Sequence, residues 1–303
     1  MSPGQMSGEE ARRAQIAISF LNHFVPEGWK FWLDCLEKPA RGSFVARAKR
    51  NWGLSQVLDV SLLLADANDH FLDVVDEFTQ GYLPNFALYA VVRGAFEADA
   101  WACWLMEPEL QDKERLARAL TLRAASLFEM RRLALPPMSK LRPGLSSAGH
   151  YRKRIKRVIA AGRRQKLSPK WHKDGRLAFV ELPKVTPLMR SLLPRPAIKV
   201  RYGNRVRPLT LGERTHGELS ARAHATFWGL MSNVTAARRI NKFQSLGVTE
   251  LDVLDFVRLL GIAVGLHDKA LKRVAMCAGF DPATWDTRRG NIPFPTDGDD
   301  RWP

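Results

Sequence analysis

Cysteine is scarce in this chain of 303 residues, and the spacing of its three copies excludes two kinds of small structure. Cys35, Cys103 and Cys277 lie far apart and are odd in number. A disulfide framework or a zinc knuckle needs closely spaced or paired cysteines, so neither fits. The cysteines therefore predict reduced thiols and a cytoplasmic protein.

Long hydrophobic runs are missing as well. The longest apolar stretches, 57–65 and 259–266, are shorter than the roughly 20 residues that a membrane helix needs. The first twenty residues include two glutamates and two arginines and have no apolar centre, so no signal peptide is predicted. No internal repeat is found. We expect no membrane partner.

Positive charge is abundant and unevenly distributed. The chain has 47 Lys and Arg against 31 Asp and Glu, a net charge of +16. Between residues 138 and 207 there are 20 basic residues and only two acids, Asp174 and Glu181, while the remainder is close to neutral. One segment thus supplies the whole excess, which indicates a basic arm for an anionic partner.

Hydrophobic periodicity predicts an all-α helical bundle with an irregular basic insertion, in which a short hairpin is an option. Helices are expected over 9–24, 26–38, 54–79, 83–106, 108–135, 151–165, 212–239 and 249–279. A strand pair is expected around 177–181 and 198–206. The chain is divided into a disordered start (1–8), N-terminal helices (9–137), a basic insertion (138–207), C-terminal helices of the same bundle (208–280) and a tail (281–303).

The most apolar helix, 83–106, carries Arg93 and Glu97 four residues apart, on one face of the helix. A helix that is apolar on nearly every side is an interior helix, where charges must be paired. Two interpretations follow. The pair is structural and joins neighbouring helices, or Arg93 holds an anion while Glu97 acts as a base or ligand. Asp99, on the same helix, is expected at an edge.

Two other helices offer pairs at helical spacing. On 54–79, Asp66, Asp69 and His70 suggest ligand binding, and the alternative is an ordinary solvated acidic face. No HExxH or ExxH signature accompanies them, so no metal site is predicted. Ser220 and His224 are four residues apart, but no GxSxG elbow surrounds them. His224 is either a core histidine or a general base.

The basic arm is centred on YRKRIKRVIAAGRRQK, residues 151–166. Phosphate contact is one interpretation, and an exposed, solvated helix is the other. Trp171 adds an aromatic ring that could stack on a base. The predicted nucleic-acid contacts are Arg152, Lys153, Lys156, Arg157, Arg163, Arg164 and Trp171.

Four segments resemble an uncharacterised all-helical family that is frequent in actinobacteria. They are NDHFL (68–72), VVRGAFEADAWACWLMEP (91–108), RLARALTLRAASLFEM (115–130) and LSARAHATFWGLM (219–231). They match that family's Asp-His, Arg-x3-Glu, Trp-Leu-x-x-Pro and Ser-x3-His elements in the same order. The resemblance covers half of the chain, implies a helical bundle and brings no established activity.

The resemblance also implies a geometry. If the three helices adjoin, six side chains would line one pocket between them, a common place for ligand sites in bundles. The six are Asp69, His70, Arg93, Glu97, Ser220 and His224, with Arg123 and Glu129 as outer members.

Three functions compete at this point. The first is a binding protein with a buried polar cluster and a basic arm for an anionic partner such as nucleic acid. The second is a helical hydrolase or nuclease that uses Glu97 and His224 as acid and base and Arg93 for phosphate. It invites comparison with HEPN-type ribonucleases, but no arginine precedes a histidine at their Arg-x4–6-His spacing. The third is a scaffold subunit or homo-oligomer that uses its aromatic N-terminal helices. No cofactor is indicated.

Overall fold

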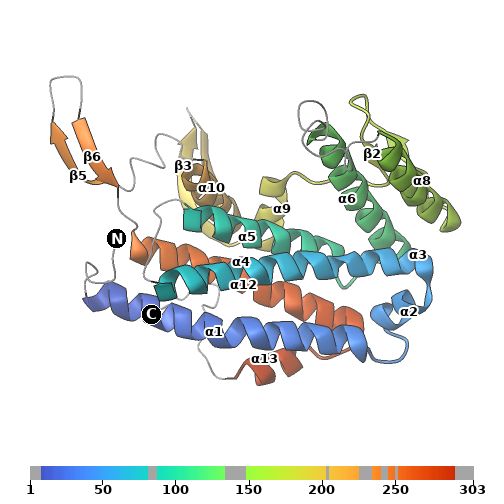
Figure 1. Cartoon of the computed structure of the whole chain (residues 1–303), viewed down its shortest axis with the longest axis horizontal. Helices are drawn as coiled ribbons and strands as arrows, with labels where there is room; N and C mark the ends of the chain where they lie inside the picture. Colours follow the sequence, from blue (N-terminus) through green and yellow to red (C-terminus); the bar gives the residue numbers. More distant parts are fainter. Residues whose placement is uncertain are drawn as a thin grey trace.

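Four long helices form the centre of the molecule (Figure 1). They are α1 (Gly8–Glu37), α4 (Val60–Gln80), α5 (Ala87–Leu105) and α12 (Val253–Ala278). Each packs against the next, α1 on α4, α4 on α5, α5 on α12 and α12 on α1, which closes a ring around one core. The structure is a computed structural model that describes residues 8–80, 87–133, 148–202, 205–224, 234–239, 245–249 and 252–290. It confirms the expected all-α bundle.

The first helix is longer than the sequence pattern predicts. We expected two helices separated at Pro26, but α1 runs through this proline. Proline inside a helix removes a backbone hydrogen bond and costs about 3 kcal/mol. The helix continues because the residues around Pro26 are core residues: Phe24, Val25, Phe31 and Trp32 are buried against the other helices. Their burial also removes these aromatic side chains as a contact surface for a scaffold.

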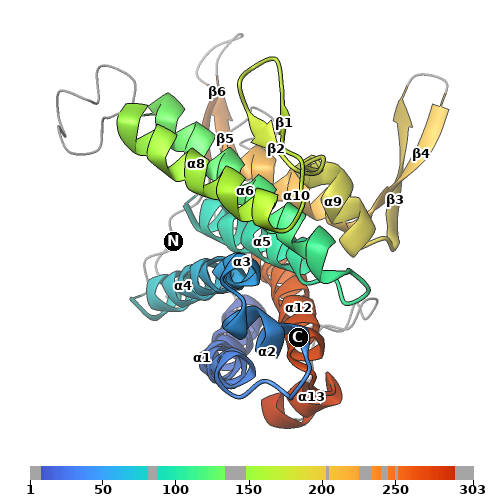
Figure 2. The same ribbon diagram turned by 90° about the vertical axis from the view of Figure 1, so that its right-hand side faces the viewer.

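An outer layer covers α5 on the side away from α1 (Figure 2). It contains α9 (Val185–Leu192) and α10 (Leu211–Ala223), which pack on α5, and the pair α6 (Asp112–Leu133) and α8 (Ala148–Arg164). Short helices connect α1 to α4 beneath this pair: α2 (Phe44–Arg50), α3 (Trp52–Ser55) and η2 (Gln56–Asp59). The expected helix 54–79 is therefore divided into three pieces.

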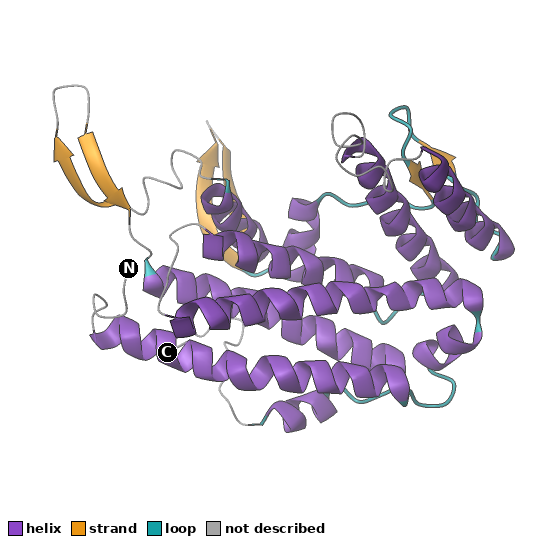
Figure 3. Ribbon diagram, viewed as in Figure 1, coloured by secondary structure: helices purple, strands orange, loops and turns teal. Residues whose placement is uncertain are grey.

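Strands occur only as small antiparallel hairpins in the described residues (Figure 3). β1 (Lys170–Trp171) pairs with β2 (Leu177–Ala178), β3 (Pro196–Tyr202) with β4 (Arg205–Thr210), and β5 (Val234–Arg239) with β6 (Ser245–Thr249). The expected pairing of 177–181 with 198–206 is wrong, because each of these strands pairs with its immediate neighbour along the chain.

The C-terminal half departs from the prediction at two other places. Instead of one helix over 212–239, α10 ends at Ala223 and residues 234–239 form β5. The helix expected from residue 249 begins later, because Thr249 lies in β6. Asp252 caps α12, and its side chain accepts a hydrogen bond from the backbone N–H of Asp255. Gly279 ends α12 as predicted, at φ +82°.

The tail expected from residue 281 begins with another helix, α13 (Ala283–Arg289). Trp285 holds it in place, because its fully buried ring packs against Phe24 and Phe31 while its Nε1 donates to Asp268 at 2.7 Å. The predictions of a disordered start and of a tail, where they concern residues 1–7 and 291–303, lie outside the described residues. Among the described helices, none has both the length and the apolar character needed to cross a membrane.

Candidate functional site

A chain of hydrogen bonds joins α5 to α10 through the Arg93–Glu97 pair. Arg93 Nε donates to Glu97 Oε1 at 2.7 Å, and Arg93 Nη1 lies 2.5 Å from His224 Nε2. On the other side, His216 Nε2 lies 3.1 Å from the same Glu97 oxygen, and His216 Nδ1 is 3.5 Å from Thr186 Oγ1 in α9. We call these five side chains the polar relay. The relay connects α5 of the bundle with α9 and α10 of the outer layer.

The hydrogen-bond chemistry of the relay fixes the roles of both histidines. A guanidinium only donates, so His224 Nε2 must accept from Arg93, which makes that imidazole neutral with its proton on Nδ1. Glu97 only accepts when ionised, so His216 Nε2 carries a proton and donates to it. The two histidines thus contact the central ion pair through the same ring nitrogen, Nε2, in opposite hydrogen-bond roles.

The relay is half-buried, which corrects the expectation of a charge pair deep in the core. The side chains of Arg93, Glu97 and His216 are 24%, 28% and 14% exposed. Burial alone would raise the pKa of Glu97, but the hydrogen bonds from His216 and Arg93 outweigh it and lower that pKa below its ordinary value of 4.5. Glu97 is therefore ionised at neutral pH.

Two free groups remain within the relay. Arg93 Nη2 and Glu97 Oε2 make no hydrogen bond to the described residues. Arg93 Nη2 therefore keeps hydrogen-bond donors that its partners in the described residues do not use. Glu97 and His224 make no direct hydrogen bond in the described residues, because the Arg93 guanidinium stands between them.

Helix α10 is held firmly in position for this contact. Thr210 and Glu213 form a capping box at its start, and Glu213 also accepts two hydrogen bonds from Arg190 of α9. Further along α10, Glu218 forms an ion pair with Arg258 of α12 at 2.5 Å. His224 is the residue that ends α10, and its side chain is exposed.

The other predicted site residues lie around the relay without joining it. Ser220 is one turn before His224, and its buried Oγ has no hydrogen-bond partner in the described residues. The ring of His70 packs on α5 at Gly94, where an added Cβ would lie 2.5 Å from His70 Nε2. His70 pairs loosely with Asp66 and Asp73, at 3.8 and 4.0 Å. Asp69 is exposed on α4.

The two residues named as outer members are also outside the relay. Arg123 bonds to Asp59, at 2.8 Å, and to Gln56, and Glu129 is exposed on α6. Throughout the part of the chain that the structure describes, no three His, Cys, Asp or Glu side chains are arranged to hold a metal ion.

Sequence reasoning missed His216, the histidine that contacts Glu97 directly. The signal was present, because His216, Ser220 and His224 follow one another at intervals of four residues in HGELSARAH. Residues at this spacing share one face of a helix. That face of α10 is the one turned to α5.

The basic arm forms a second candidate site. On α8, Ile155, Val158 and Ala161 are buried toward α6, and the predicted contacts Arg152, Lys153, Lys156, Arg157, Arg163 and Arg164 are all exposed. The segment that follows α8 carries Lys170, Lys173 and the ring of Trp171, which is 57% exposed. The cations therefore form one outward face, which we call the α8 face.

Comparisons of this chain with protein-family models, with curated proteins and with solved structures gave no match.

Proposed function

We propose that this protein binds nucleic acid through the α8 face. The observation that carries the proposal is that five cations of this face have no acidic partner in the part of the chain that the structure describes. Arg152, Lys153, Lys156, Arg157 and Arg163 make no ion pair within the described residues. Unpaired cations on one rigid face attract a polyanion and release its counterions on binding.

The dimensions of α8 suit a phosphate backbone. Its 17 residues span about 25 Å, and one strand of duplex DNA places a phosphate about every 3.4 Å along the axis. Because the apolar side of α8 is fixed on α6, the cations need no folding step before binding. Trp171 at the adjoining hairpin supplies a ring on which an unpaired base can stack.

We place this activity in the cytoplasm. Cys35, Cys103 and Cys277 are all buried and unpaired, as expected for a reducing compartment. Fractionation of cells that produce the protein tests this placement, and recovery in a secreted fraction would refute it.

The test of binding neutralises the α8 face without disturbing its packing. Lys153→Ala/Arg157→Ala removes two exposed cations and substitutes a good helix former. We expect this variant to bind a fluorescent 20-nucleotide probe about tenfold more weakly than the unchanged protein, measured by anisotropy. The control is Arg12→Ala/Lys30→Ala, which removes the same charge from α1 on the opposite side of the bundle. Equal affinities for all three proteins would refute the proposal.

A second candidate is a helical hydrolase or nuclease at the polar relay. The observation that favours it is the direct contact between Glu97 and His216, together with the free Nη2 of Arg93. Arg93 would hold a phosphate while Glu97 takes the proton of an attacking water. His216 would protonate the leaving oxygen as the phosphorus–oxygen bond breaks. His224 then fixes the position of the arginine.

A nuclease assay with labelled RNA and DNA tests this second candidate. Glu97→Gln keeps the size of the side chain and should lower the rate at least about 100-fold, since general base catalysis contributes that much or more. Asp69→Asn, exposed on α4 outside the relay, is the matched control and should retain full activity. Absence of cleavage by the unchanged protein, or equal rates for Glu97→Gln and Asp69→Asn, would exclude the hydrolase.

A further inference from the structure

A second group of cations lies far from α8 in the sequence. Between Pro39 and Leu58 the chain has four basic residues, Arg41, Arg47, Lys49 and Arg50, and no acid. Three of them belong to the short helix α2. Their position in the fold decides whether they extend the α8 face or form an unrelated patch.

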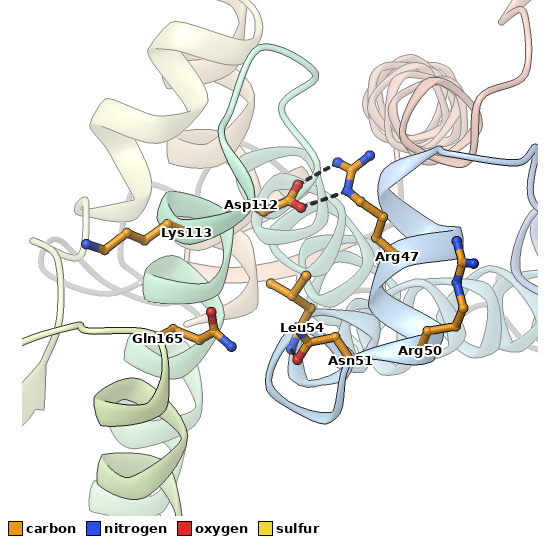
Figure 4. A pocket seen from close by; sticks show the side chains of 7 residues that line it. All are labelled: Arg47, Arg50, Asn51, Leu54, Asp112, Lys113 and Gln165. Atoms are coloured by element: carbon orange, nitrogen blue, oxygen red, sulfur yellow. Dashed lines mark hydrogen bonds and ion pairs between the residues drawn. The ribbon is translucent and has the colours of Figure 1, made fainter.

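The structure brings α2 to the C-terminal end of α8. A pocket of about 510 Å³ lies between them and the start of α6 (Figure 4). It is lined by Arg47, Arg50, Asn51, Leu54, Asp112, Lys113 and Gln165. Gln165 directly follows Arg164, the last residue of α8, so the pocket adjoins the end of the α8 face.

The charge of the pocket is positive, because its one acid is already neutralised. Asp112 accepts two hydrogen bonds from Arg47, at 2.9 and 2.8 Å. Arg50 and Lys113 lie on opposite sides of the pocket, and the Lys113 ammonium points away from Arg50 (Figure 4). Both side chains are exposed and make no ion pair in the described residues. Only the Nε of Arg50 is used, in a bond to the Ala46 carbonyl at 3.1 Å, so its two terminal nitrogens stay available.

We propose that this pocket is a phosphate-contact site that continues the α8 face. A nucleic-acid strand that follows α8 toward its C-terminus enters the pocket beside Gln165. There Arg50 and Lys113 contact phosphates of the sugar–phosphate backbone from the two walls. Arg47 and Asp112 do not contribute charge, but their bidentate pair holds α2 and α6 at a fixed separation. This inference rests on the proposed nucleic-acid binding.

The inference distinguishes Arg50 and Lys113 from Lys49, the neighbouring cation in α2. The Lys49 ammonium donates to the Leu36 and Glu37 carbonyls at the end of α1, at 3.0 and 3.2 Å. It therefore serves the helix end and does not line the pocket. A Lys49 variant would lose a helix cap as well as a charge, and it is not a suitable probe.

The test compares Arg50→Ala/Lys113→Ala with the unchanged protein, with Lys153→Ala/Arg157→Ala and with the α1 control Arg12→Ala/Lys30→Ala. Affinity for the 20-nucleotide probe, single-stranded and duplex, is measured at several salt concentrations. We expect the pocket variant to bind about 3- to 10-fold more weakly and its salt slope to fall in magnitude by about 1 to 2, one for each lost phosphate contact. Thermal unfolding should be unchanged, since both side chains are exposed.

The outcomes separate this inference from the proposed function. If the α8 variant loses affinity and salt slope while the pocket variant loses neither, the pocket assignment is wrong and the α8 face stands. If the unchanged protein binds no probe, both are wrong. If the pocket binds free anions instead, millimolar inorganic phosphate at constant ionic strength should stabilise the unchanged protein but not the pocket variant. The two proteins would then bind the oligonucleotide with equal affinity. That result overturns the backbone assignment.

Discussion

Asp99 and His267 form a hydrogen-bonded pair in the centre of the bundle, where neither side chain is exposed at all. His267 Nδ1 lies 2.8 Å from Asp99 Oδ1, and the rings of Phe24 and Phe71 pack around the imidazole. The other carboxylate oxygen and His267 Nε2 have no hydrogen-bond partner in the described residues. Burial raises the pKa of Asp99 above its ordinary value of 3.8, and the nearby His267 only partly offsets this.

The pair predicts a specific dependence of stability on pH. Because the folded-state pKa of Asp99 lies above the unfolded one, its contribution to stability is complete below the unfolded pKa and is lost as pH rises through the folded pKa. Asp99→Asn cannot ionise and keeps an acceptor for His267. The free energy of unfolding of the unchanged protein should therefore fall, relative to that of Asp99→Asn, as the pH rises from about 4. Denaturant titrations at several pH values measure this difference.

Asp99→Ala is the control for the hydrogen bond itself. It leaves His267 Nδ1 unsatisfied in the core and should cost roughly 2–4 kcal/mol at neutral pH. If Asp99→Asn is destabilised as strongly as Asp99→Ala at neutral pH, the carboxylate charge is needed and the interpretation of the pair is wrong.

Single residues show where prediction from the sequence succeeds and where it fails. The spacing of Arg93 and Glu97 predicted a pair on one helix face, and the structure has that pair. The burial of each charged side chain was not predictable, because apolar residues occur on nearly every side of α5. As a result Asp99, expected at an edge, is fully buried, while Arg93 and Glu97 are half-exposed. Burial depends on which helices cover each face, and that is a property of the packing.

At the scale of elements, the attachment of α8 to α6 and the following segment positions the basic face. Thr121 Oγ1 of α6 accepts hydrogen bonds from the backbone N–H groups of Phe179 and Val180, at 3.0 and 3.2 Å. The Phe179 ring lies directly on Gly162 of α8, where an added Cβ would be 2.3 Å from its Cε1. The missing side chain at residue 162 is therefore required for this contact.

Gly162→Ala tests whether this contact fastens the arm. Alanine normally stabilises a helix relative to glycine by about 0.5–1 kcal/mol, so the substitution would raise the free energy of unfolding if the methyl group met no neighbour. Here the clash with Phe179 should reverse the sign, with a loss of about 1–3 kcal/mol in the free energy of unfolding. In a Phe179→Ala background the same substitution should be neutral or stabilising. A stabilising effect in the unchanged protein would show that the ring does not hold α8.

Elements were predictable where local signals agreed with the packing. The end of α12 at Gly279 and the existence of α5, α6 and α8 follow from periodicity and end signals in the chain. The continuity of α1 through Pro26 does not, because it depends on contacts with α4 and α12, which are far away in the sequence.

At the scale of the whole molecule, basic side chains differ between two parts of the surface in whether they have acidic partners. Around α1 and α13, basic side chains have acidic partners: Arg288 pairs with Asp34 at 2.6 Å, and Lys272 with Asp286 at 2.7 Å. The α8 face lies across the bundle from α1 and α13 (Figure 2). Five of its cations, together with Arg50 and Lys113 of the pocket, have no such partners in the described residues. Cations without acidic partners, in a chain of net charge +16, are thus concentrated on one part of the surface.

The most direct measurement of nucleic-acid binding is the affinity of the unchanged protein for the 20-nucleotide duplex as a function of salt. We predict a linear fall of log K with log salt, with a slope of magnitude about 4 or more, because several phosphates are neutralised at once. The slope should become shallower by about 1 to 2 in Lys153→Ala/Arg157→Ala. An affinity that is independent of salt, or no binding at 50 mM salt (a condition under which phosphate contacts are strong), would contradict the proposed function of the α8 face.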